Sequence, residues 1–320
     1  MPLLSVVVPA FNEQEVITEA ARRLLAACAP YLDAGVEVVF VDDGSRDATW
    51  PMLAKLAAEM PQVIAVRLSR NFGHQLALTA GLEVCTGQRI LMIDADLQDP
   101  PELLPEMMAV MDQGADVVYG RRIERKGETA FKRVTASLFY RLLNRMTDVD
   151  IPHEVGDFRL VNRQVLDALR ALPEQHRFVR GMVSWLGFQQ VAFPYVRQER
   201  FAGTTKYPLR KMLRLAVDAI TGFSTVPLRA SLWLAGVGFL SAIGVTAYAL
   251  ISWLFFDAVR GWASLTVVIA LFASAQLLCL GILGEYVGRM FVELKARPLA
   301  IIREIVGTAP SAAEMRDRKI

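Results

Sequence analysis

The sequence has few of the residues that build disulfide or zinc frameworks. Its 320 residues include three cysteines and three histidines. Cys28, Cys85 and Cys279 are scattered and share no metal-ligand spacing with the histidines, which excludes a disulfide scaffold and a zinc site. His74 lies nearest to the expected site, but no role is assigned to any histidine. Neither G-x-G-x-x-G nor a P-loop motif occurs after the predicted strands, which argues against a dinucleotide enzyme and a P-loop ATPase.

Net charge is also low, and apolar residues are in excess. A formal charge of +2 leaves no nucleic-acid footprint, so no nucleic acid partner is expected. Hydrophobic residues make up 53% and charged residues 21%, with a mean hydropathy of +0.33. No charged residue occurs in Ala230 to Phe256 or in Trp262 to Gly284. At about 1.5 Å per residue each run can cross a core of roughly 30 Å, which predicts transmembrane helices over 228–256 and 262–285.

The short linker 257–261 allows only a tight hairpin, so both ends of the helix pair lie on one side of the membrane. Basic residues mark that side as cytoplasmic by the positive-inside rule: Lys206, Arg210, Lys211, Arg214, Arg229, Arg289, Lys295, Arg297 and Arg303. We expect a multi-pass protein of the inner (cytoplasmic) membrane, without a signal peptide and with both termini in the cytoplasm.

Two flanking segments are expected to lie along the bilayer surface. In 208–227 apolar residues recur at helical spacing and basic residues occupy the other surface, which is typical of an interfacial helix; a helix packed on a soluble core is the alternative. A second juxtamembrane helix and a cytoplasmic tail are predicted for 286–320. The remaining 1–207 form the catalytic domain.

Strand and helix patterns alternate through the first 120 residues, which predicts an α/β domain with a mainly parallel, doubly wound sheet. The predicted strands are 5–8, 36–41, 63–68, 89–93 and 116–120, and the predicted helices are 14–29, 48–60, 74–82 and 101–111.

Charged loops follow these strands at 9–13, 42–45, 94–99 and 121–122, so a parallel sheet gathers them on one rim, where such sheets bind ligands. Asp94 and Asp96 flank the small Ala95, and with Gln98 they form an oxygen-ligand set for Mg²⁺ or Mn²⁺ carrying a diphosphate. The alternative is that one aspartate caps the helix begun by Pro100-Pro101.

The motifs together resemble a known family. Val-Pro-Ala-Phe-Asn-Glu at 8–13, Val-Asp-Asp-Gly-Ser at 41–45, Arg-Asn-Phe-Gly at 70–73 and Asp-Ala-Asp-Leu-Gln-Asp-Pro-Pro at 94–101 look like the inverting family 2 glycosyltransferases of GT-A fold. The motifs at 156–160, 200–207 and 283–289, with the two spans, resemble the polyprenyl-phosphate members. These include bacterial O-antigen glucosyl transferases, aminoarabinose transferases of lipid A modification and dolichol-phosphate mannose synthase.

The resemblance implies transfer of a sugar from a nucleotide diphosphate to undecaprenyl phosphate, with UDP-glucose as the first donor expected and a homo-oligomer, a tetramer, as the assembly. The implied metal ligands are Asp94, Asp96 and Gln98, with Asp96 also catalytic. The implied nucleotide-sugar contacts are Pro9, Phe11, Glu13, Val41, Asp42, Asp43, Ala95, Arg122 and Arg133. As an alternative, Asp42 and Asp43 are turn and N-cap residues ahead of the helix that begins near Ala48. The alternative for the basic run 121–126 is a set of solvent-exposed charges without a ligand.

Much of the acceptor phosphate is dianionic at pH 7, so the enzyme must bind it rather than remove a proton from it. Arg200 and Lys206, just before the first span, and Arg159 are the expected phosphate ligands. Asp157 is expected to position the attacking phosphate or to accept a proton, and a salt bridge to a neighbouring arginine is its alternative.

Three other functions stay open. The same reaction can use a UDP-aminoarabinose derivative or GDP-mannose. A processive polysaccharide synthase is disfavoured because no Gln-x-x-Arg-Trp motif occurs and two spans cannot enclose a channel. A membrane-anchored nucleotide-binding protein without activity is disfavoured because the carboxylates are present.

Overall fold

The computed structural model describes residues 1–123, 155–196, 224–255 and 262–308. Eight strands form one sheet in the order β7-β5-β6-β4-β1-β2-β3-β8. Their bounds are β1 Leu4–Ala10, β2 Val36–Asp42, β3 Val63–Leu68, β4 Arg89–Met92, β5 Val117–Arg122, β6 Val155–Asn162, β7 Gln190–Tyr195 and β8 Ile302–Val306. The five strands expected from the sequence are confirmed, and β6, β7 and β8 are additional.

The centre of the sheet is parallel. β1 pairs in parallel with β2 and β4, and β2 with β3. Every residue of β1 and β2 is buried, which explains why these strands are mostly apolar rather than alternating, with Ser5 and Glu37 as polar residues inside them. The mainly parallel sheet predicted above is therefore confirmed, with antiparallel pairings at β6 and at the β8 edge.

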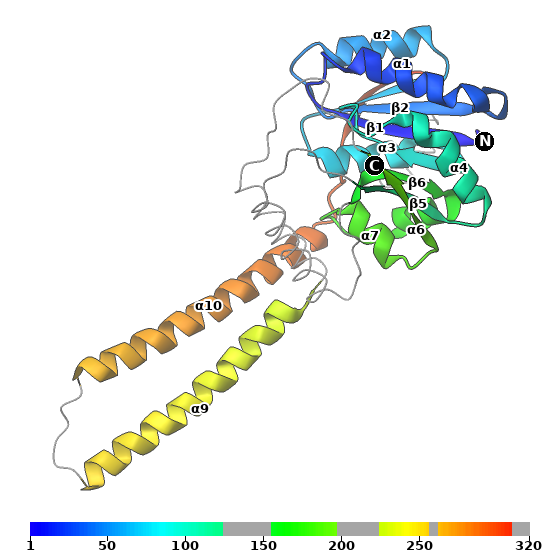
Figure 1. The fold of residues 1–320 in the computed structure, drawn as a ribbon. Helices are drawn as coiled ribbons and strands as arrows, with labels where there is room; N and C mark the ends of the chain where they lie inside the picture. Colours follow the sequence, from blue (N-terminus) through cyan, green and yellow to red (C-terminus); the bar gives the residue numbers. More distant parts are fainter. Residues whose placement is uncertain (124–154, 197–223, 256–261, 309–320) are drawn as a thin grey trace. The chain divides into compact units, whose positions relative to one another are not determined.

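Helices cover both faces of the sheet. Val6 and Val8 belong to the core that α1 (Ile17–Cys28), α2 (Thr49–Glu59) and α4 (Leu104–Asp112) cover. Val7 faces α3 (His74–Val84), where Gly81 leaves room for its side chain. Figure 1 shows α1 and α2 together on one side of β1 and β2, with α3 on the other. Among the described residues of this unit, the other helices are η1 (Ala29–Ala34), η2 (Pro101–Leu103), α6 (Arg163–Ala171) and α7 (Val179–Trp185).

The topology brings the charged loops to one rim. β6 runs antiparallel to both β4 and β5, so β4 and β5 point the same way and their carboxyl ends meet. The loops after β1, β2, β4 and β5 therefore share this rim, as predicted. The contact between Arg122 at the end of β5 and Asp99 after β4, at 3.7 Å, is the direct evidence.

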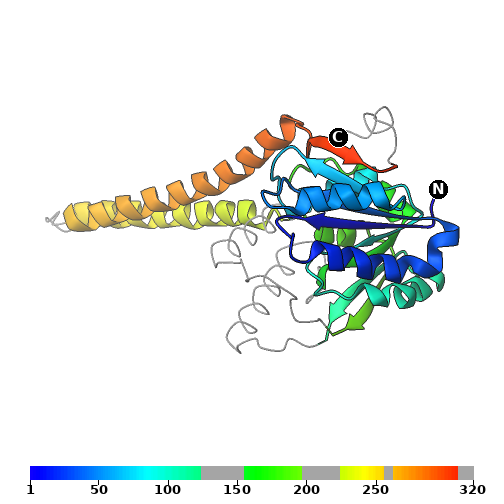
Figure 2. The ribbon, with the colours of Figure 1, turned by 90° about the horizontal axis from the view of Figure 1, so that it is seen from above.

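The second compact unit contains two long helices, α9 (Val226–Phe255) and α10 (Trp262–Leu294). They pack as an antiparallel pair: Cys279 Sγ donates to the carbonyl of Ser231, and Tyr286 Oη to that of Ser224 at 2.6 Å. Figures 1 and 2 both show the helices side by side. Leu232, Trp233 and many other apolar side chains on them are exposed.

These two helices are long and apolar enough to span a membrane. The qualifying stretches are Val226–Gly244 and Val267–Leu294, with mean hydropathies of 1.5 and 2.3, and neither stretch is buried. An exposed apolar surface of this extent is costly in water and favourable in lipid. The structure thus contains the two candidate spans expected from the sequence.

The chain after the second span differs from the expected helix and tail. α10 continues without a break through Leu294, so 286–294 form part of the same long helix. Residues 302–306 then form β8, which pairs antiparallel with β3 and belongs to the first unit. This five-residue strand has little apolar signal because it contains Arg303 and Glu304, which are exposed, and none of its residues is fully buried.

Candidate active site at the carboxyl rim

The Asp-Ala-Asp motif forms a tight turn directly after β4. Asp96 Oδ1 accepts the backbone N–H of Gln98 at 3.1 Å, and Leu97 adopts a left-handed conformation with φ of 60°. Asp94 and Asp96 are half-buried, whereas Asp99 is buried. The turn therefore presents two carboxylates at the rim and directs a third into the protein.

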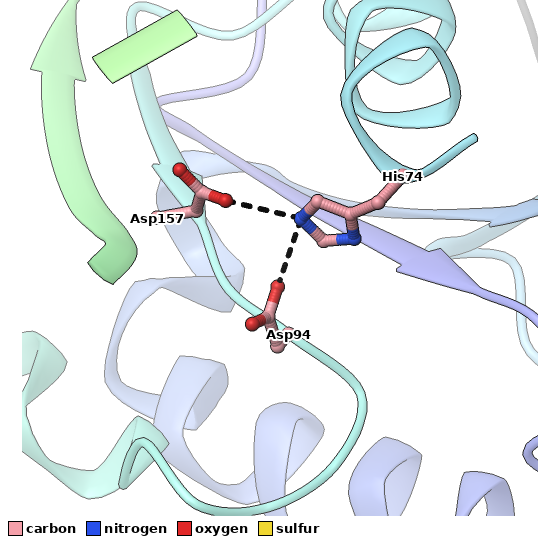
Figure 3. A group of neighbouring side chains, drawn as sticks. All are labelled: His74, Asp94 and Asp157. Carbon is pink, nitrogen blue, oxygen red and sulfur yellow. Dashed lines mark hydrogen bonds and ion pairs between the residues drawn. The ribbon is translucent and has the colours of Figure 1, made fainter. Parts of the chain in front are cut away.

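His74, the first residue of α3, lies between two carboxylates that are distant in sequence (Figure 3). Its Nε2 is 3.1 Å from Asp157 Oδ2 and 3.4 Å from Asp94 Oδ1. Asp94 follows β4, and Asp157 lies on the neighbouring strand β6. The structure thus brings Asp94 and Asp157 to the same histidine, a residue to which the sequence pattern assigned no role.

Further donors converge on Asp157. Gln75 Nε2 donates to Oδ2 at 2.9 Å, and Arg180 of α7 donates to Oδ1 through Nε at 3.3 Å. Gln75 Oε1 in turn accepts the backbone N–H of Val179 at the start of α7. The salt-bridge alternative for Asp157 is therefore present, with Arg180 as its partner.

The charges in this cluster shift one another's pKa values. Burial would raise the pKa of Asp157, but Arg180 and the hydrogen bond from His74 hold it well below its usual range. Burial opposes the charged form of His74, yet Asp157 and Asp94 together raise its pKa to about 9. Burial raises the pKa of Asp94 to about 6, although the charge of His74 acts in the opposite direction.

The donor atoms suit a hard divalent cation. Ligand atoms of His74, Asp94 and Asp157 lie within 4.8 Å of one another, a spacing that can hold a metal ion. Asp94 Oδ1 is buried and accepts no hydrogen bond; its contact is the ion pair with His74 Nε2 at 3.4 Å, which a cation bound at this oxygen would replace. Asp157, in contrast, already accepts from Gln75 and Arg180. The oxygen donors of the Asp-Ala-Asp turn therefore fit Mg²⁺ or Mn²⁺ best.

The loop after β2 is fastened to its neighbours by hydrogen bonds. Both oxygens of Asp43 accept backbone N–H groups, Oδ1 from Phe72 at 2.7 Å and Oδ2 from Gly73 at 2.9 Å. Asp42 Oδ1 accepts the N–H of Ser45. Asp42 thus has the turn role named as its alternative. Asp43 instead binds backbone N–H groups 29 and 30 positions away and fixes the start of the helix that carries His74.

The other residues expected at the nucleotide differ in exposure. Pro9, Val41 and Ala95 are buried. Glu13 is half-buried, and Phe11 is 40% exposed, so its ring is the most accessible apolar surface among them. A half-exposed ring at a ligand rim is available to stack on a base.

The expected basic residues divide into three groups. Arg122 reaches the rim and contacts Asp99. Arg159 is 3% exposed, donates to the carbonyl of Gly156, and has its pKa lowered to about 10 by burial. The third group lies outside the described residues: Arg133, Arg200 and Lys206.

Comparison with known proteins decides the family. The profile described as Glycosyl transferase family 2 matches residues 5–170, which include strands β1 to β6 and the residues His74, Asp94, Asp96 and Asp157. The chain belongs to glycosyl transferase family 2. It is therefore a glycosyltransferase, and its Rossmann-like, mostly parallel sheet with an Asp-x-Asp turn is the GT-A fold.

Relatives within the family match nearly the whole chain. An uncharacterized glycosyltransferase of Bacillus subtilis, YkcC, is 48% identical over 308 residues, covering 95% of this chain and 94% of the relative. The SfII prophage-derived bactoprenol glucosyl transferase of Shigella flexneri is 41% identical over 308 residues, covering 94% and 97%. Both alignments thus extend far beyond the family domain.

Two solved structures of sugar-transferring enzymes are similar to part of this chain. Glucosyl-3-phosphoglycerate synthase from Mycobacterium tuberculosis, in complex with Mn²⁺, UDP-glucose and phosphoglyceric acid, has a TM-score of 0.46 and 21% identity over 69% of this chain and 78% of that one. A mannosyltransferase from Pyrobaculum calidifontis, in complex with GDP-mannose and Mn²⁺, has a TM-score of 0.45 and 19% identity over 87% of each chain.

Proposed function

We propose that this family 2 glycosyltransferase moves glucose from UDP-glucose to undecaprenyl phosphate at the cytoplasmic face of the membrane. The observation that carries the proposal is the 41% identity to bactoprenol glucosyl transferases over 308 residues. At 94% of this chain, that similarity includes the site and the two apolar helices together. A lipid-linked acceptor explains why one chain combines a sugar-nucleotide domain with membrane spans.

The donor would bind along the carboxyl rim. Asp94, Asp96 and Gln98 would hold Mg²⁺ or Mn²⁺, which when bound neutralises diphosphate charge and stabilises the leaving UDP. Arg122 would contact the same diphosphate, with Arg133 as a second cation. The base and ribose would lie along the loops after β1 and β2, with Phe11 as the stacking surface and Glu13, Asp42 and Asp43 as polar neighbours.

The acceptor phosphate would attack the anomeric carbon from the side opposite the diphosphate. The new bond joins C1 to a phosphate oxygen, the bond from C1 to UDP breaks, and the configuration inverts. A dianionic phosphate needs no proton removed. Asp157, already hydrogen-bonded through both oxygens, would therefore position the reacting groups rather than act as a base.

Capture of the lipid phosphate would fall to Arg200 and Lys206, which precede the first span in the sequence. The burial of Arg159 leads us to revise its expected role. A side chain that is 3% exposed is not accessible to a lipid headgroup, so Arg159 would instead contribute positive charge beside Asp157.

The reaction is tested with purified protein in detergent, undecaprenyl phosphate, Mn²⁺ and a panel of UDP- and GDP-sugars. We expect lipid-linked product from UDP-glucose, lost with EDTA and in Asp96→Asn, and retained in the exposed-site control Asp33→Asn. Product from another sugar nucleotide would replace UDP-glucose as the proposed donor. Metal-dependent UDP binding without product from any sugar would contradict the transferase reaction itself.

The membrane arrangement is tested in spheroplasts, and the assembly is tested on the purified protein. We propose that α9 and α10 cross the bilayer with both termini cytoplasmic, so a membrane-impermeant maleimide applied to spheroplasts should label Asp257→Cys but not Asp33→Cys. The reverse pattern would overturn the topology. We also propose a homotetramer, which size-exclusion chromatography with light scattering would distinguish from a monomer or dimer.

A further inference from the structure

Three side chains from separate parts of the chain meet beside the Asp-Ala-Asp turn. Tyr195, the last residue of β7, donates its hydroxyl hydrogen to Asp99 Oδ1. Arg122, the last residue of β5, donates from Nε to the same hydroxyl oxygen at 3.3 Å, and its Nη2 lies 3.7 Å from Asp99 Oδ1. We call this set the Asp99–Tyr195–Arg122 cluster.

The cluster is buried, and the backbone at Gly156 leaves space for the Arg122 side chain. Asp99 is 1% exposed and Tyr195 4% exposed, and the Tyr195 ring packs edge-on against Phe158 with centroids 5.5 Å apart. A Cβ added at Gly156 would lie 2.5 Å from Arg122 Nη2. The absence of a side chain at Gly156, the second residue of β6, is what makes room for the guanidinium.

The buried carboxylate of Asp99 interacts strongly with the guanidinium of Arg122. Asp99 accepts from Tyr195 and attracts Arg122 in surroundings of low polarity, where charge-assisted contacts are stronger than in water. A free arginine side chain loses rotamer entropy when a ligand immobilises it. In the cluster that loss has already occurred during folding, so a ligand of Arg122 does not bear it again.

The cluster also links Arg122 to the metal turn. Asp99 lies three residues after Asp96, and the intervening backbone is constrained by the Asp96 to Gln98 hydrogen bond and by Leu97 in its left-handed conformation. The guanidinium and the two aspartates of the turn are therefore held in a set spacing. A nucleoside diphosphate that bridges a cation and an arginine requires such a spacing.

We propose that Tyr195 and Asp99 are positioning residues of the donor site, which act by orienting Arg122 toward the diphosphate of a metal-bound nucleoside diphosphate. This inference rests on the proposed function for the role of Arg122. In this proposal Tyr195 and Asp99 act through Arg122 and do not contact the sugar.

The test measures UDP affinity in Mn²⁺ by calorimetry, alongside KM and kcat for UDP-glucose. Tyr195→Phe removes the hydroxyl that contacts Asp99 and Arg122. Gly156→Ala deletes no side-chain contact, but its added Cβ displaces the Arg122 guanidinium. Each should weaken UDP binding and raise the KM for UDP-glucose on the order of tenfold, with a smaller change in kcat. Tyr31→Phe and Gly236→Ala are the matched controls, since the Tyr31 ring is only half-buried and a Cβ at Gly236 meets no atom within 4 Å.

A double-mutant cycle separates positioning from a general loss of structure. In an Arg122→Ala background, Tyr195→Phe and Gly156→Ala should cause no further loss of UDP affinity, because the residue that they orient is gone. Equal losses in both backgrounds would overturn the inference. If Tyr195→Phe elutes as aggregate, the result for Gly156→Ala decides whether the inference holds. In the Gly156→Ala, Arg122→Ala double variant the smaller side chain at position 122 relieves the clash.

The same data distinguish this inference from the proposed function. If no sugar nucleotide gives product while the cycle for UDP affinity is non-additive, the proposed reaction fails and the positioning role stands. If glucose is transferred while Arg122→Ala binds UDP as tightly as the unmodified protein, the reaction stands and the positioning role is wrong.

Discussion

Asp43 Oδ2 accepts the backbone N–H of Gly73 at 2.9 Å, and this contact joins the loop after β2 to the first turn of α3. The next residue along the chain is His74, which lies between Asp94 and Asp157. An aspartate read in the sequence as a nucleotide ligand is thus also the residue that sets the position of the histidine at the centre of the site.

Replacing Asp43 with asparagine should destabilise the domain by about 1–3 kcal/mol, because an amide NH₂ would face a backbone N–H in a buried position. Thermal unfolding in detergent measures the effect, and Asp33→Asn at an exposed site is the control. An unchanged melting temperature would mean that the two backbone hydrogen bonds contribute nothing to stability.

Replacing His74 with alanine should lower kcat by about tenfold to a hundredfold while the protein stays folded. The imidazole contacts Asp94 and Asp157, and small displacements of reacting groups carry penalties of this size. His176→Ala, at an exposed position, should retain full activity. A kcat for His74→Ala within about twofold of the unmodified protein would show that His74 only fills space.

Cys28 and Cys85 should resist maleimide in the folded protein. Burial raises the pKa of each thiol to about 12, so at pH 8 almost none is thiolate, and neither side chain is exposed. In a Cys279→Ala background, mass spectrometry should find no label in the native protein and two labels in dodecyl sulfate. Labelling of the native protein would indicate that the domain opens readily.

Gly307→Ala should destabilise the domain by about 1–3 kcal/mol more than Gly114→Ala. Both glycines have a φ above 100°, so both substitutions carry the same backbone strain. A Cβ at Gly307 would collide with the carbonyl oxygen of Val63 on β3, whereas a Cβ at Gly114 meets no atom. Thermal unfolding of the two variants measures the difference, and equal melting temperatures would mean that β8 does not contribute to the stability of the sheet.

The sequence by itself determined the class of the protein. The mostly apolar runs 36–41 and 63–68, in which Glu37 and Arg67 are the charged residues, marked strands of a parallel sheet, because strands covered on both faces need no polar alternation. The charge-free runs marked the two long helices, and motifs such as Asp-Ala-Asp at 94–96 marked the rim and the family. Each of these signals is local, so neighbouring residues are enough to carry it.

Only the tertiary structure decided which side chains act together. His74, Gln75 and Arg180 converge on Asp157 from α3 and α7, and Tyr195 reaches Asp99 across 96 positions. Such contacts depend on strand order and on helix placement over the sheet, which leave no periodic trace in the sequence. The same holds for β8, a short half-exposed strand stabilised by pairing with β3 rather than by its own composition. His74-Gln75 directly after the Arg-Asn-Phe-Gly motif was the one available signal, and only the contact with Asp157 gave it meaning.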